Sequence, residues 1–119
     1  MNAPRPRRPK PARPVAAAAL QPDERALLGR HVAGLCAETI TLSLGKNLQV
    51  ELVPSTWCGA WSLVITGKER SVRIAIEEHE VLVRPVAHVA IRKTLQFCER
   101  IHLTKRLQEF AQLEDLLEE

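Results

Sequence analysis

The chain has 119 residues with a formal net charge of +3, and it is 45% hydrophobic and 26% charged, as ordinary globular proteins are. This length fits one domain of about a hundred residues and is too short for two. No stretch approaches the roughly eighteen consecutive apolar residues of a membrane-spanning helix, so we expect a protein without a membrane segment.

The first fourteen residues combine prolines with positive charge. Five cations and no acid occur in this segment, namely Arg5, Arg7, Arg8, Lys10 and Arg13. Removing these five charges from the net charge of +3 leaves −2 for the remaining chain, so the excess of positive charge is concentrated at this end. Because such a segment cannot bury its side chains in a core of its own, the sequence predicts a disordered arm at residues 1–20 in front of a single domain at residues 21–119.

A basic extended arm favours contact with a polyanion, and nucleic acid, DNA or RNA, is the first hypothesis for its partner. Residues 6–9 also fit the PxxP pattern, so a groove on a protein, or another anionic surface, is the second hypothesis. A solubilising arm with no specific partner is the third. The apolar run at residues 15–20 is shorter than the roughly 7–15 residues of a secretory signal, so we expect a cytoplasmic protein.

A helix is predicted at about residues 22–38. Pro22, Asp23 and Glu24 are typical of a first helical turn. Apolar residues then recur at helical spacing, at Leu28, Val32, Leu35 and Cys36. Gly29 and Gly34 each cost about 1 kcal/mol relative to Ala, so this helix must dock on another element to persist.

From Thr39 the apolar residues alternate with polar ones, which is the pattern of strands with one wet face. Four strands are predicted, at residues 39–44, 48–52, 61–65 and 72–76, with Val81–Val83 as an optional fifth. Gly45-Lys46-Asn47 would be the turn of a first hairpin and residues 66–70 the turn of a second. The result is a four-stranded antiparallel meander, and only the helices at either end of the chain are available to cover its apolar face.

A helical pattern returns at Val86 and carries two apolar faces. The first face holds Ile91, Leu95, Cys98 and His102, and the second holds Leu103, Leu107, Phe110, Leu113 and Leu117. At about 100° per residue, the second face is turned by roughly 100° from the first, so one straight helix cannot bury both against one sheet. Either the helix breaks near Leu103–Thr104 and closes over its own domain, or residues 104–118 form a partner-binding helix that joins a second copy or another protein. Both interpretations stay open, within an α+β fold.

No motif for chemistry is recognisable. The cluster Glu77-Glu78-His79-Glu80 has no partner motif such as HExxH and is predicted to be a solvated turn. Cys36, Cys58 and Cys98 include no CxxC pair, which indicates free thiols. No phosphate-loop, dinucleotide or hydrolase signature occurs. We therefore expect no enzyme, no metal, no cofactor and no small-molecule substrate.

Two tryptophans differ in their surroundings. Trp61 shares its strand face with Leu63 and Ile65, so it is predicted to be in the core, whereas Trp57 lies in a loop and is a candidate contact for a partner. Taken together, the sequence predicts a small binding or regulatory protein that contacts a polyanion through its arm and self-associates through residues 103–117. The alternative is a protein–protein adaptor or chaperone-like component that uses its sheet face and its C-terminal helix.

Overall fold

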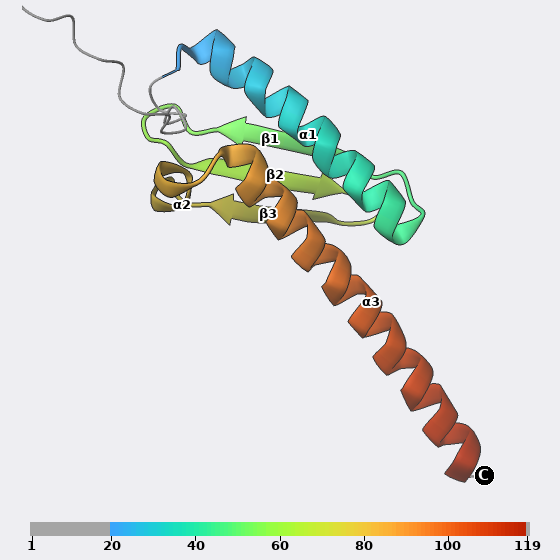
Figure 1. Ribbon diagram of the computed structural model, residues 1–119. Coiled ribbons are helices and arrows are strands. Elements are labelled where there is room, and N and C mark those ends of the chain that lie inside the picture. Colours follow the sequence, from blue (N-terminus) through green and yellow to red (C-terminus); the bar gives the residue numbers. More distant parts are fainter. Residues whose placement is uncertain (1–19, 119) are drawn as a thin grey trace, which may run out of the picture.

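The computed structural model describes residues 20–118, so the predicted basic arm lies outside the described residues except for Leu20. Six elements follow in chain order: α1 (Pro22–Leu44), β1 (Gln49–Pro54), β2 (Trp61–Thr66), β3 (Ser71–Ile76), α2 (Glu78–Val83) and α3 (Val86–Glu118). The three strands form one sheet, and two long helices lie against it (Figure 1). The fold is α+β, as the sequence predicts.

The first helix is longer than predicted. It begins at Pro22 as expected, but it continues through residues 39–44, where the alternating pattern predicts a strand. Ile40 is fully buried one turn after Cys36, while Leu42 is 88% exposed, so the apparent alternation is the edge of a helical stripe. The hydroxyls of Thr39 and Thr41 donate to carbonyls four residues earlier, at 2.9 and 3.0 Å, which accommodates these β-branched residues in a helix.

The sheet therefore has three strands, not four. Gly45 ends α1 in the left-handed conformation (φ 67°), and its N–H donates to the Thr41 carbonyl, so residues 45–47 link a helix to a strand and are not a hairpin turn. β1 pairs with β2 and β2 with β3, both antiparallel, with Leu52 opposite Leu63 and Leu63 opposite Ile74. The predicted meander is confirmed for these three strands.

One face of the sheet is covered by α1 and α3, which lie side by side (Figure 1). The core between these layers contains Ile40, Leu63, Ile65, Ile76 and Trp61, all at most 2% exposed. This arrangement confirms that the terminal helices cover the apolar face and that Trp61 is a core residue. Because the covered face is buried, it is not free to hold a partner.

Gly29 explains how closely α1 approaches β1. A Cβ atom built at Gly29 would lie 2.5 Å from the Leu52 carbonyl oxygen and 3.2 Å from the Trp61 ring, whereas one built at Gly34 would meet nothing within 4 Å. Glycine at position 29 therefore serves packing between helix and strand. Gly34, on the exposed side of the same helix, has no such role.

The segment at residues 81–83 is part of a helix and not a fifth strand. The backbone N–H of Glu77 donates to Glu80 Oε1 (2.9 Å), which caps the first turn of α2, and Pro85 follows where the helix has ended. After it, α3 runs from Val86 to Glu118 without interruption. The predicted alternative of a break near Leu103–Thr104 is therefore wrong, because Pro and Gly are absent from this helix and nothing else stops it.

Candidate functional site

The second half of α3 extends beyond the rest of the fold. We call α1, the sheet, α2 and α3 up to His102 the body. The last polar contact between α3 and the body joins His102 Nε2 to the carbonyl oxygen (3.1 Å) and hydroxyl (3.3 Å) of Ser43, one residue before α1 ends. Every side chain at residues 103–117 is exposed, and Figure 1 shows this part of α3 continuing alone past the sheet and α1.

Six large apolar side chains lie in this free part of α3, and all of them except Leu116 share one face of the helix. We call these five the distal stripe: Leu103, Leu107, Phe110, Leu113 and Leu117, exposed by between 53% and 78%. Their spacing of three or four residues places them on one face of the helix. Soluble proteins seldom leave such a row of large apolar groups without a covering element.

The distal stripe lies on the opposite side of α3 from the body. Thr94 and Cys98 face the body and are at most 1% exposed. Leu103 and Leu107 each follow one of them by nine residues, which is about two and a half turns, and so they point the other way. This separation is larger than the roughly 100° predicted from sequence, because Leu95, assigned there to the buried face, is 46% exposed.

The charge of α3 changes sign along its exposed half. Arg100, Lys105 and Arg106 precede Leu107, and no acid lies among residues 100–106. The end of the helix is acidic instead, with Glu109, Glu114, Asp115 and Glu118 and no base. The apolar face is therefore accompanied by a basic half and an acidic half.

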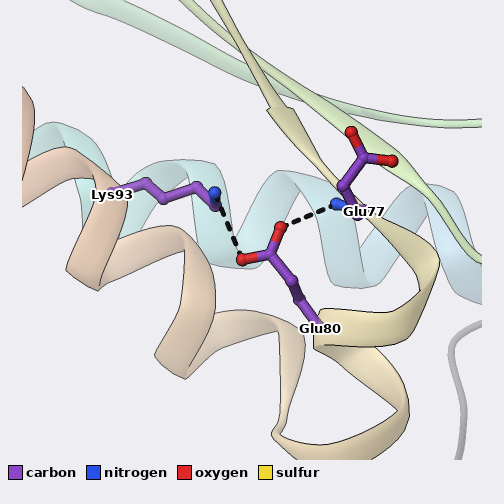
Figure 2. Close-up of polar contacts among 3 residues, drawn as sticks. All are labelled: Glu77, Glu80 and Lys93. Atoms are coloured by element: carbon purple, nitrogen blue, oxygen red, sulfur yellow. Dashed lines mark hydrogen bonds and ion pairs between the residues drawn. The ribbon is translucent and has the colours of Figure 1, made fainter.

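A second surface feature lies where α2 meets α3. A hollow of about 220 Å³, which we call the basic hollow, is lined by Glu80, Arg84, His88, Val89, Arg92, Lys93 and Gln96. Figure 2 shows its one acid: Glu80 accepts from the Glu77 N–H and pairs with Lys93 Nζ at 3.2 Å. The hydrogen bond from the Glu77 backbone, and then Lys93, lower the pKa of Glu80, so this carboxylate is ionised and already paired at neutral pH.

The cations of the basic hollow that remain are exposed. Arg84 Nη1 lies 3.2 Å from His88 Nε2, and because a guanidinium can only donate, the imidazole nitrogen accepts. Within residues 20–117, neither Arg84 nor Arg92 forms an ion pair with a carboxylate. Two guanidinium groups are thus available here to an anionic ligand.

The loop between β1 and β2 is held by a buried cation. Arg25, only 8% exposed, donates to the carbonyls of Ser55 (2.6 Å) and Cys58 (3.1 Å) and lies over the Trp61 ring at 5.1 Å. The same loop presents Trp57, which is 91% exposed. In Figure 1 the loop lies at the α2 end of the sheet, away from the end where α3 leaves, so Trp57 and the distal stripe do not form one surface.

The three thiols are free. Cys36 and Cys98 are buried between the helices, and burial raises the pKa of the Cys36 thiol, which keeps it protonated and unreactive. Cys58 is half-buried and its Sγ donates to Ser55 Oγ at 3.4 Å, with no base in contact. Among residues 20–117, no three His, Cys, Asp or Glu side chains gather as a metal site would require.

Sequence reasoning identified the distal stripe and Trp57 but missed two features. Arg25 was not singled out, because a cation on an amphipathic helix is ordinarily solvated and only the fold brings the β1–β2 loop over it. The basic hollow was also missed: the four-residue spacing of His88 and Arg92 places these two on one side of a helix, but Arg84 precedes α3 and only the fold brings it beside them.

Comparison of the chain with protein-family models, with curated proteins and with solved structures gave no match. Of the helices in the described residues, none has the length and apolar character needed to cross a membrane.

Proposed function

We propose that this protein is a non-enzymatic protein-binding module that holds its partner along the distal stripe of α3. The observation that carries the proposal is the position of this stripe: five large apolar side chains on a helix face that points away from the body. A helix in water gains most of its stability from packing of an apolar face, and none of the residues 20–117 packs against this face of α3. A partner that covers the stripe would supply that packing.

The form of the helix also supports this function. Residues 103–118 continue a helix that is already nucleated by the body, so only propagation is needed and the stripe is presented pre-ordered. Pre-ordering reduces the entropy lost on binding and favours a helix-to-helix contact. The projecting half of α3 would thus present an ordered binding surface, and the body would hold it in place.

The proposal is tested by affinity capture from cells that produce the protein. The stripe variant Leu107→Glu/Phe110→Glu is compared with the control Gln108→Glu/Gln112→Glu, which adds the same two charges on the opposite face of the helix. Wild type and control are expected to retain the same proteins, and the stripe variant to lose them. Retention of one set by all three proteins contradicts the proposal.

A second candidate function is contact with a polyanion, and the basic hollow is the observation that favours it. Arg84 and Arg92 add two cations to the five predicted for the arm, Arg5, Arg7, Arg8, Lys10 and Arg13. If all of them contact phosphates, the affinity for nucleic acid should fall steeply with salt, by a slope of about −0.9 per contact on duplex.

Fluorescence anisotropy with labelled DNA and RNA at two salt concentrations tests this candidate. Deleting residues 1–14 and replacing Arg84 and Arg92 by Ala are each expected to weaken binding and reduce the salt dependence. Absence of binding, or binding that neither change affects, removes the candidate and leaves the protein-binding function standing.

A further inference from the structure

We infer that the partner on the distal stripe is a second copy of this chain, bound antiparallel along α3. This inference rests on the proposed function, because it names the partner of the same stripe. Its evidence lies in the symmetry of the stripe and in the charges beside it.

The apolar face has its midpoint at Phe110, halfway between Leu103 and Leu117. A two-fold axis at this level places Leu103 of one copy beside Leu117 of the other and Phe110 beside its own equivalent. Self-complementary pairing of one patch is the usual geometry of a homodimer. The overlap from Leu103 to Leu117 covers 15 residues, or roughly 22 Å of helix at about 1.5 Å per residue.

Charge selects the antiparallel orientation. With the axis at Phe110, Arg106, which borders the stripe, lies level with Glu114 of the second copy, whereas Lys105 and Asp115 lie on the outer side of the helix, away from the seam. In a parallel pair Arg106 and Glu114 would each instead lie level with its own equivalent, base beside base and acid beside acid. Charges beside a helical seam set the partner and the orientation in this way.

The outer face of α3 before the stripe limits how far the pair extends. Arg92, Gln96 and Glu99 precede Leu103 by three, two and one helical turns and lie on the same side of the helix, where they are exposed. Because this part of the face is polar, a second helix has an apolar seam only from Leu103 onwards. The body of the other copy stays clear, since the stripe faces away from α1 and the sheet.

Sedimentation equilibrium of the full chain tests the inference. Because the seam is short, the dimer should be weak, and the concentration series should run from about 5 to about 500 µM. The apparent mass is expected to rise from 13.3 kDa towards twice that value. Leu107→Glu/Phe110→Glu should stay monomeric, and Gln108→Glu/Gln112→Glu should behave as wild type.

The orientation is tested by charge reversal. Arg106→Glu places two acids level with each other across the seam, and Glu114→Lys places two bases there, because residues 106 and 114 of the two copies lie at the same level. Each variant alone should dimerise at least about tenfold more weakly than wild type, while an equal mixture of the two should recover association. Circular dichroism of dilute samples confirms that every variant keeps its helices.

Disulfide trapping then separates antiparallel from parallel pairs. In a Cys58→Ser background, Leu103→Cys is mixed with Leu117→Cys and the mixture is mildly oxidised. A cross-link between positions 103 and 117 is expected, and links joining 103 to 103 and 117 to 117 in its place overturn the antiparallel pairing.

Two results separate this inference from the proposed function. A mass of 13.3 kDa at every concentration overturns pairing with a second copy. If the stripe variant nevertheless loses proteins that wild type captures, the binding function stands with a different partner. If wild type stays monomeric and also captures the same proteins as the stripe variant, the inference and the proposed function fail together.

Discussion

Residues 86–102 and residues 103–118 belong to one helix, yet their apolar side chains have different surroundings. In the first part, Ala90, Thr94 and Cys98 are buried against α1, and the opposite side is polar. In the second part the apolar residues are on that opposite side, where the body offers nothing to cover them. The apolar face of α3 thus changes sides near His102: its first part packs against the body, and its second part is exposed on the opposite side.

The body and the distal half of α3 also differ in what stabilises them. The body is held by buried apolar side chains and by polar contacts such as those of Arg25. The distal half depends on helix propagation and on whatever pairs with its stripe. Matched substitutions in the two regions therefore differ in size, and in whether the effect depends on protein concentration.

The largest contrast is expected between Leu63→Ala and Leu107→Ala. Leu63 is fully buried in the sheet, so its truncation should lower the free energy of unfolding by about 2–5 kcal/mol at every protein concentration. Leu107 is 60% exposed, so its truncation should change the stability of dilute protein by less than about 0.5 kcal/mol.

Denaturant titrations at several protein concentrations measure both effects. The wild-type midpoint should rise with concentration because pairing stabilises the folded chain, and Leu107→Ala should abolish this rise. An equal loss of stability in both variants of the dilute protein would contradict the division of α3 into a packed half and a free half.

Within the body, Arg25 and Arg30 of α1 differ in burial, and their alanine variants should differ in stability. Arg25→Ala removes two hydrogen bonds to loop carbonyls and the stacking on Trp61, and should cost about 3 kcal/mol. Arg30→Ala, at an exposed position of the same helix, should change stability by less than about 0.5 kcal/mol. Thermal unfolding monitored by circular dichroism distinguishes them; similar midpoints for both variants would show that the loop is not held by Arg25.

The two glycines of α1 should respond to alanine with opposite signs. Gly29→Ala places a methyl group against the Leu52 carbonyl and should destabilise the body by about 1–3 kcal/mol. Gly34→Ala meets no neighbouring atom and should stabilise it by up to about 1 kcal/mol through helix propensity. Chemical denaturation measures both, and a stabilising Gly29→Ala would refute the close approach of α1 to β1.

The smallest effect is expected at Glu80 and depends on pH. Because the folded pKa of Glu80 is lowered, its contribution is complete above the ordinary glutamate pKa of about 4.3 and is lost as pH falls below that value. Glu80→Gln should therefore cost about 1 kcal/mol or less at pH 7 and close to nothing at pH 3. Stability curves at both pH values test this; a constant difference would exclude the ionised carboxylate as the cause.

The sequence predicted the elements whose patterns are long or clearly bounded. The start of α1, the strands at residues 61–65 and 72–76, and the helix from Val86 were all recognisable from periodicity and from proline. Residues 39–44 were misassigned because six residues do not distinguish alternation from the edge of a helical stripe. The burial of Ile40 in the core, which follows from the fold, is what favours the helix. Residues 81–83 were misassigned because three β-branched or aliphatic residues indicate a strand until the capping contact of Glu80 is known.

The candidate site was predictable where it depended on one helix and not where it depended on contacts between elements. The spacing of Leu103, Leu107 and Phe110 is by itself enough to indicate a second apolar face on the last helix. The direction of that face relative to the body depends on which residues α1 covers, and the Arg25 contacts depend on the position of the β1–β2 loop. Long-range packing of this kind leaves no local signal.

Amide hydrogen exchange across a dilution series measures the central claim most directly, because it reports the two halves of α3 separately. We expect amides of residues 86–102 to exchange slowly at every concentration, and amides of residues 103–117 to be protected in concentrated protein and to lose that protection on dilution. Protection of both halves that is equal and independent of concentration would show that the second half is stabilised within its own chain, and would contradict the account.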